Sequence, residues 1–142
     1  MEIFRFGEKT AHIDWDRSVE MVKKFPSDVY ANDCFSNVFR LACHYHKSDN
    51  HDGEIKIAYG FVSSQNERIY CAHAFFIDSD GRVIDPTLAM RNKLDDARYS
   101  ISFIVDQRGY FGLLVKAKRT DLRACLEVFK IMNQCVQEAH QQ

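Results

Sequence analysis

Proline and glycine are scarce in this sequence, which contains two prolines and six glycines. Long disordered linkers are rich in such residues, so their scarcity indicates a chain that is folded along most of its length. Acidic and basic residues nearly balance at a formal net charge of −1, and the lysines and arginines are dispersed. Binding to nucleic acid requires a concentrated basic surface, so nucleic acid is excluded from the expected partners.

Long apolar runs are also missing. No window reaches the roughly 18 consecutive apolar residues of a transmembrane helix, and the stretch from Met1 to Gly7 lacks the apolar core of a signal peptide. The expectation is a cytoplasmic protein that does not enter a membrane, with secretion by a route without a cleaved signal left open. The five cysteines include no Cys-x-x-Cys pair, and an odd number of them fits free, reduced thiols better than a disulfide framework.

The residues that are present are those of a folded domain. Of the 142 residues, 46% are apolar, 27% are charged and eleven are phenylalanine. This size is typical of one domain, which buries about 68–70% of the surface of its unfolded chain. We therefore expect a single domain over residues 1–142, and the sequence makes no prediction of its oligomeric state.

Helical patterns lie toward both ends of the chain. Asp14–Phe25 is predicted to be a short helix, with either Asp14 or Asp16 as its N-cap and Pro26 ending it. A second helix is predicted from Cys34 to about His46, with Asp33 as its N-cap. A third is expected from about Asp121 to His140, where it closes the fold.

Strand-like segments fill the middle of the chain. Glu54–Ser63, Arg68–Asp78 and Arg82–Asp85 are rich in β-branched and aromatic residues and are separated by polar turns, which predicts an antiparallel meander. Ser100–Asp106 and Tyr110–Lys118 flank a Gln-Arg-Gly turn and predict a second hairpin. This order of elements predicts an α+β fold, in which the cysteine-bearing helix packs on an antiparallel sheet of about five strands.

Cys34 is the candidate nucleophile among the cysteines. It lies in the first turn of its predicted helix, where unsatisfied N–H groups and the helix dipole favour a thiolate. Cys43 faces another side of the same helix, and Cys125 and Cys135 are interpreted as small buried residues of the last helix.

His73 is the candidate base. It lies in the middle of a predicted strand among apolar neighbours, unlike the other five histidines. An imidazole in such surroundings needs hydrogen-bond partners. The alternative interpretation is an ordinary histidine of the core or the sheet, with no chemical role.

Asp85, at the end of the next predicted strand, is the candidate for orienting the imidazole. If the turn between the two strands has three residues, Ser79–Gly81, Phe75 pairs with Asp85. Asp85 and His73 then lie on one face of the sheet, with Cα atoms about 7–8 Å apart. A two-residue turn would instead point the two side chains to opposite faces, so the proposed pairing depends on the type of turn.

Three segments resemble the core of transglutaminase-like proteins, in the papain-like cysteine superfamily. They are Ile-Ala-Tyr-Gly60-Phe-Val, Ala-His73-Ala-Phe-Phe-Ile and Gly81-Arg-Val-Ile-Asp85-Pro-Thr87. In that family a cysteine opens a helix, a His-Ala-aromatic strand carries the base, and an Asp-Pro-Thr segment carries the third member of the triad. The resemblance extends from Tyr30 to Leu88 and implies a papain-like fold with Cys34, His73 and Asp85 as a catalytic triad.

The resemblance also implies an activity. The enzyme would attack an amide carbonyl of a protein or peptide through a thioester, as a protease, amidase or glutamine deamidase, and would need no cofactor. Two positions depart from the family: Phe75 replaces the usual tryptophan, and Gly60 follows its tyrosine instead of preceding it. Amine transfer is therefore the less favoured reaction. The alternative is a non-catalytic protein-binding module on the same fold.

The residues near Cys34 also bear on two other questions, which groups could bind an oxyanion and whether a metal could bind. The oxyanion of an acyl intermediate needs preorganised donors, and the candidates are the backbone N–H of Cys34 and the side chain of Asn32. His44, His46 and His51 lie close together in sequence, but their spacing matches a structural zinc site poorly. No metal is expected.

Overall fold

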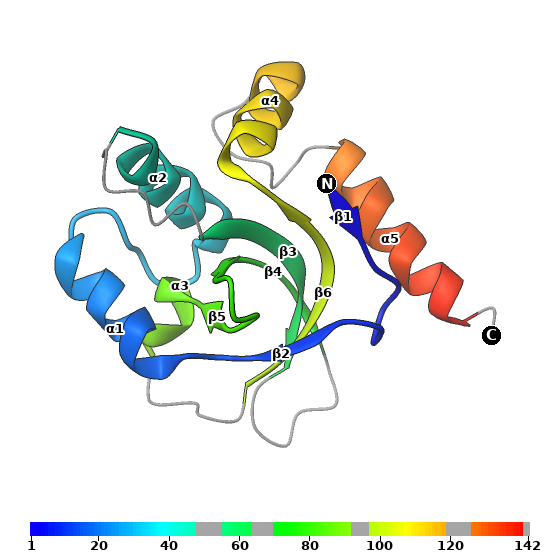
Figure 1. Cartoon of the computed structure of the whole chain (residues 1–142), viewed down its shortest axis with the longest axis horizontal. Coiled ribbons are helices and arrows are strands. Elements are labelled where there is room, and N and C mark those ends of the chain that lie inside the picture. The colour runs from blue at the N-terminus through cyan, green and yellow to red at the C-terminus, as the bar shows by residue number, and fades with distance from the viewer. Residues whose placement is uncertain (48–54, 64–69, 92–96, 119–125, 141–142) are drawn as a thin grey trace.

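The sheet is the centre of the fold. The computed structural model describes residues 1–47, 55–63, 70–91, 97–118 and 126–140 (Figure 1). Within these ranges, six antiparallel strands form one sheet in the order β1-β6-β3-β4-β5, and β2 also pairs with β6. The strands are β1 Glu2–Ile3, β2 Thr10–His12, β3 Lys56–Ser63, β4 Cys71–Ile77, β5 Val83–Ile84 and β6 Arg98–Val105. The predicted α+β class and the meander, here β3-β4-β5, are confirmed.

Five helices flank this sheet in the described part of the chain. They are α1 Trp15–Lys24, α2 Cys34–Lys47, α3 Pro86–Ala89, α4 Gln107–Ala117 and α5 Leu126–His140. In the view of Figure 1, α1, α2 and α3 lie to the left of the sheet and α5 lies to its right. Asp14 caps α1 by accepting a hydrogen bond from the backbone of Arg17, and Asp33 caps α2 with its carbonyl, which accepts from Asn37 N at 2.8 Å. The predicted cysteine-bearing helix and C-terminal helix are thus confirmed.

The predicted second hairpin is wrong. Tyr110–Lys118 was expected to be a strand, but the chain forms helix α4 directly after β6. The Asp106 side chain accepts a hydrogen bond from Gly109 N at 2.7 Å and so caps this helix. Tyr110 and Leu114, four residues apart, then share its buried face. β6 pairs instead with β3 and with the N-terminal strands β1 and β2, which the sequence pattern did not predict.

Both faces of the sheet are buried, which explains the nearly continuous apolar character of its long strands. Side chains of one face, including Tyr59, Phe76 and Phe103, pack in one cluster with residues of α2, α4 and α5. Alternate side chains, including Phe75 and Tyr99, pack in a second cluster with β2 and Leu88 of α3. His73 precedes Phe75 by two positions and therefore points to the second face.

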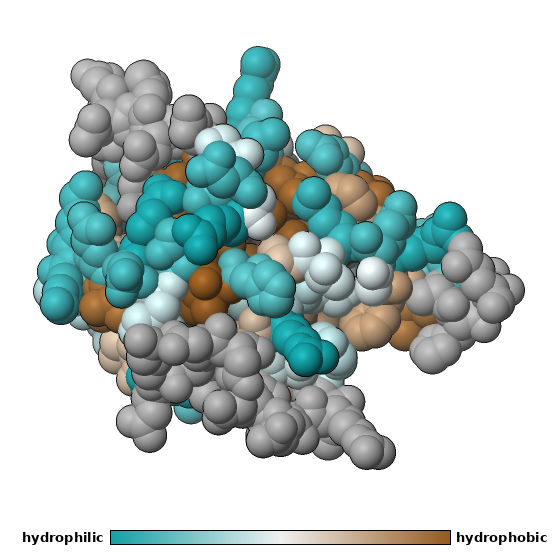
Figure 2. Space-filling model, turned by 60° about the horizontal axis from the view of Figure 1, so that its bottom comes forward, coloured by the Kyte–Doolittle hydropathy of each residue, from teal (hydrophilic) through white to brown (hydrophobic). Residues whose placement is uncertain are grey.

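The surface mixes polar and apolar side chains. Figure 2 shows hydrophilic and hydrophobic residues interspersed over one face of the molecule. None of the helices within the described ranges combines the length and the apolar composition of a membrane span.

At Gly60, in the centre of the sheet, the backbones of β3 and β6 approach closely. Gly60 pairs with His73 on β4, and the register with β6 shifts between Tyr59 and Gly60. A Cβ atom at Gly60 would lie 2.2 Å from the carbonyl oxygen of Ser100, which is backbone and cannot rotate away. We expect Gly60→Ala to lower the free energy of unfolding by about 2–3 kcal/mol, as measured by urea denaturation.

The matched control for this substitution is Gly112→Ala in α4. A Cβ at Gly112 meets no atom within 4 Å, so alanine should leave stability unchanged or raise it by up to about 1 kcal/mol. Equal effects of the two substitutions would show that the close approach at Gly60 does not constrain the sheet.

Candidate active site

Cys34 opens helix α2 and is half-buried. The turn before it is held by Asn37, one helical turn later, whose side chain accepts a hydrogen bond from Tyr30 N at 2.9 Å and donates to Tyr30 O at 2.8 Å. Asn37 is fully buried and also donates to Thr87 Oγ1 at 2.9 Å. It therefore ties the segment that carries Cys34 to the segment that follows Asp85. Sequence reasoning missed this residue, for which the only signal was a polar side chain on the buried face of the helix.

The turn between β4 and β5 places Asp85 beside His73. Phe76 pairs with Ile84, and Asp78 N donates to Arg82 O at 3.0 Å, so the turn has three residues, the one of the two open cases in which His73 and Asp85 share a face. The consequence is direct contact: His73 Nε2 lies 2.7 Å from Asp85 Oδ2.

Asp85 is a fully buried carboxylate with several hydrogen-bond donors around it. Besides His73, it accepts a hydrogen bond from Tyr99 Oη at 2.7 Å and one from Leu88 N at 3.0 Å. Its own backbone N–H donates to Ser18 Oγ at 2.9 Å. It also caps α3, where proline is suited to the first position. Tyr99 was not predicted as a partner, because this residue lies on β6, which no turn connects to β4 in the sequence.

The titration of these groups follows from burial and contact. Burial alone lowers the pKa of His73, but the charge of Asp85, its hydrogen bond and contact with Cys34 together raise this pKa to about 10. Burial alone raises the pKa of Asp85, but His73, Tyr99 and Leu88 N hold it below its usual value. Burial and the neighbouring Asp85 charge raise the pKa of the Tyr99 hydroxyl. At neutral pH the group is therefore an aspartate, an imidazolium and a neutral phenol.

Cys34 and His73 meet in this arrangement, since a side-chain hydrogen bond with Cys34 contributes to the raised pKa of His73. Because Nε2 is engaged by Asp85, the ring nitrogen left for the Cys34 sulfur is Nδ1. Thiol, imidazole and carboxylate thus form one chain of contacts, the arrangement that an activated nucleophile requires.

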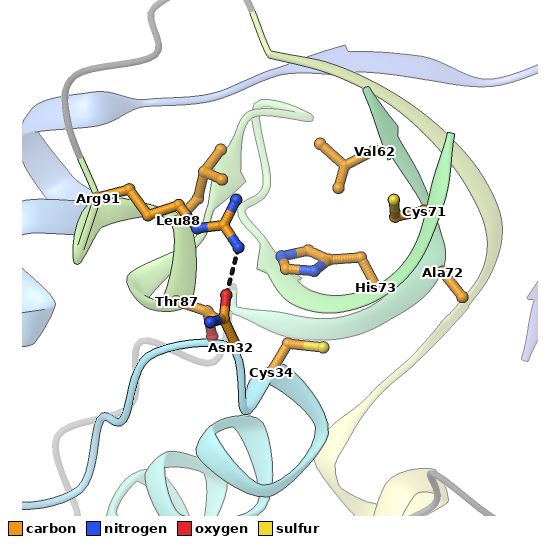
Figure 3. Close-up of a pocket in the computed structure, with 9 residues that line it drawn as sticks. All are labelled: Asn32, Cys34, Val62, Cys71, Ala72, His73, Thr87, Leu88 and Arg91. Carbon is orange, nitrogen blue, oxygen red and sulfur yellow. Dashed lines mark hydrogen bonds between the residues drawn. The ribbon is translucent and has the colours of Figure 1, made fainter. Parts of the chain in front are cut away.

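Cys34 and His73 open onto a pocket of about 220 Å³ (Figure 3). It is lined by residues of the turn before α2, of β3, β4 and of α3 and its C-terminal end: Asn32, Cys34, Val62, Cys71, Ala72, His73, Thr87, Leu88 and Arg91. Asp85 lies behind His73, away from this space.

Asn32, the candidate oxyanion donor, lies at the edge of this pocket. Its backbone is left-handed, with φ of 59°, a conformation that asparagine tolerates better than most residues. Its side-chain oxygen accepts a hydrogen bond from Arg91. Cys34 is the first residue of α2, where backbone N–H groups have no partner within the helix, so its N–H remains the other candidate donor.

No group of three or more potential metal ligands is found among the described residues. His44 instead contacts Asp28, with Nε2 2.6 Å from Oδ2, and stacks on Phe25. The side chains of His46 and His51, and all of Cys125, lie outside the described part, while Cys135 is buried as the sequence predicted.

The chemistry available in this pocket is that of a thiol beside an imidazole which a buried carboxylate holds in place. Such a group can transfer a proton and form a covalent bond to an electrophilic carbon. No protein-family model, curated protein or solved structure matches this chain.

Proposed function

We propose that this protein is a cysteine-nucleophile enzyme of papain-like fold, which cleaves an amide bond through a thioester on Cys34. The observation that supports it is the contact between the buried carboxylate of Asp85 and His73, 2.7 Å apart, on the side of the ring away from Cys34. Buried ion pairs also occur for structural reasons, and what favours catalysis here is the Cys34 thiol in contact with the ring at an open pocket.

In the proposed mechanism the proton on His73 Nδ1 comes from the Cys34 thiol, so that the resting pair is a thiolate beside an imidazolium. The raised pKa of His73 favours this imidazolium, which Asp85 stabilises. The thiolate attacks the carbonyl carbon, and the tetrahedral oxyanion accepts hydrogen bonds from Cys34 N–H and from the side chain of Asn32. His73 returns its proton to the leaving nitrogen, the C–N bond breaks, and a thioester remains. Water, deprotonated by His73, then releases the acid and restores the thiol.

Hydrolysis is favoured over amine transfer at this site. Water at roughly 55 M competes with any amine that lacks a dedicated pocket. None of the described residues lining the pocket is acidic, and Arg91 adds a positive charge, so a protonated lysine finds no counter-ion there. We therefore propose a protease, amidase or glutamine deamidase acting on a protein or peptide in a reducing, cytoplasmic setting, not on nucleic acid.

Alkylation of the thiols tests the nucleophile directly. Cys71 lines the same pocket and is more exposed than Cys34, but among the described cysteines it is Cys34 that forms a hydrogen bond with His73. We expect iodoacetamide to modify Cys34 at least about tenfold faster than Cys71 near neutral pH, because the imidazolium stabilises its thiolate. Mass spectrometry of peptides from partly modified protein measures both rates.

Half-buried Cys43 serves as the second internal reference. If Cys34 reacts no faster than Cys71 and Cys43, His73 does not activate it, and a binding module becomes the better interpretation of this fold.

A further inference from the structure

Arg91 occupies a particular place in the candidate active site. It follows α3, and its backbone N–H donates to Leu88 O at 3.0 Å. Figure 3 shows its guanidinium reaching over the pocket from α3 toward Asn32, on the side that faces His73. The side chain is exposed, so a ligand in the pocket can reach it.

The partner of Arg91 is neutral, unlike those of three other arginines in the described part of the chain. Its guanidinium donates a hydrogen bond to the amide oxygen of Asn32. Three other arginines instead lie 2.7–3.6 Å from carboxylates: Arg17 from Asp78, Arg40 from Asp33 and Arg82 from Asp14. Among the described residues, the positive charge of Arg91 is therefore left for a ligand.

The charged groups around the pocket favour a negatively charged ligand. Among the residues lining it, none is acidic, and the charge of His73 is already opposed by Asp85 behind it. A guanidinium offers two parallel N–H donors that match the two oxygens of a carboxylate. One free guanidinium suits a carboxylate better than a phosphate dianion, which carries about twice the charge.

We propose that Arg91 is a specificity residue, which binds a carboxylate of the substrate next to the amide that Cys34 attacks. This rests on the proposed function for the attack itself. On binding, the carboxylate replaces Asn32 as the partner of Arg91 and releases the Asn32 side chain toward the reacting carbonyl. The apolar side chains of Val62 and Leu88 line the same pocket and contact the uncharged part of the substrate. The substrate is thus an acidic peptide, with its carboxylate on a side chain or at a C-terminus.

Three small probes distinguish a side-chain carboxylate from a C-terminal carboxylate, and none of them has to be cleaved by the protein. N-acetylglutamic acid α-amide carries a side-chain carboxylate, N-acetylglutamine carries a free α-carboxylate, and N-acetylglutamine α-amide is neutral. Each is tested at millimolar concentrations and constant ionic strength for its ability to slow the alkylation of Cys34 by excess iodoacetamide. This readout needs only a reactive thiol. The probes can therefore fail to protect Cys34 in a protein that still hydrolyses amides, and they can protect Cys34 in a protein that does not.

We expect at least one acidic probe to give half-protection at a roughly fivefold to tenfold lower concentration than the neutral probe. Arg91→Gln should remove this preference, whereas Arg108→Gln, the same loss of charge at an exposed position on α4, should keep it. The acidic probe that protects identifies the source of the carboxylate. Equal protection by all three probes, or a preference that survives in Arg91→Gln, would overturn the proposal.

Discussion

Cys34→Ala is expected to lower turnover by about 10⁴-fold or more, because it removes the atom that forms the thioester. The fold should remain intact, since Cys34 is only half-buried and the core around it is formed by larger side chains. The thermal midpoint should therefore move little while activity is lost. The matched control is Cys71→Ala, which removes an exposed thiol from the same pocket without touching His73.

The assay offers a glutamine-containing protein with and without a labelled primary amine, and follows ammonia, label and chain cleavage together. Ammonia without label identifies a deamidase, and chain cleavage identifies a protease. Stoichiometric label at millimolar amine would contradict hydrolysis and leave Cys34 as the nucleophile. Full activity of Cys34→Ala in any of the three readouts would falsify its assignment.

The pairing of His73 with Asp85 depends on local chemistry, and the sequence predicted it on the condition that the turn has three residues. A Ser-Asp-Gly turn sets the register of a hairpin, and the register decides which face each side chain takes. The caps Asp14 and Asp33 were predictable for the same reason, since an N-cap is defined by its own residue and the next few.

Segments without such a signal were predicted wrongly or missed. The apolar run from Tyr110 in α4 fits a strand or a helix, and short apolar runs cannot be told apart by periodicity alone. The Asp106 cap, three residues before Gly109, was the signal that favoured a helix. β1 and β2 have only 2 and 3 residues, too few for a pattern, and exist because β6 supplies their partners.

The contacts that support the candidate site come from distant parts of the chain. Tyr99 reaches Asp85 from β6, Ser18 from α1, and Asn37 joins α2 to Thr87. Each is a long-range hydrogen bond that satisfies a buried polar group, and such bonds become visible only when the tertiary packing is known. The sequence therefore indicates the three candidate residues Cys34, His73 and Asp85 better than it predicts the contacts that hold them in place.

Asp85→Ala is expected to lower the free energy of unfolding by about 3–5 kcal/mol, because it leaves the buried His73 charge without a partner. The donors Tyr99 Oη and Leu88 N lose their acceptor at the same time. Asp85→Asn keeps the shape and some of these hydrogen bonds but loses the charge, so it should cost less stability and retain residual activity. Urea denaturation measures the first effect, and the amide-hydrolysis assay measures the second.

The pH dependence of stability reports on the charges of His73 and Asp85 and not on how their side chains pack. The pKa of His73 is raised from 6.5 to about 10 in the folded protein. The stabilisation of the fold by its charged ring is therefore complete below pH 6.5 and is lost as pH rises toward 10. The lowered pKa of Asp85 affects stability at acid pH. The stabilisation by its carboxylate is present above pH 3.8, the ordinary pKa of this group, and is lost as pH falls. Wild-type protein should therefore lose on the order of a few kcal/mol between about pH 6 and pH 10.

Asp85→Asn should flatten the alkaline part of this profile, because His73 no longer gains a charged partner on folding. The pair of His44 and Asp28 is the internal control: its atoms are 2.6 Å apart, but both side chains are partly exposed to solvent. Asp28→Asn should thus change stability by less than about 1 kcal/mol and keep the wild-type slope. An Asp85→Asn protein with the wild-type slope would mean that the charge on His73 does not depend on Asp85, and that the carboxylate serves only to cap α3.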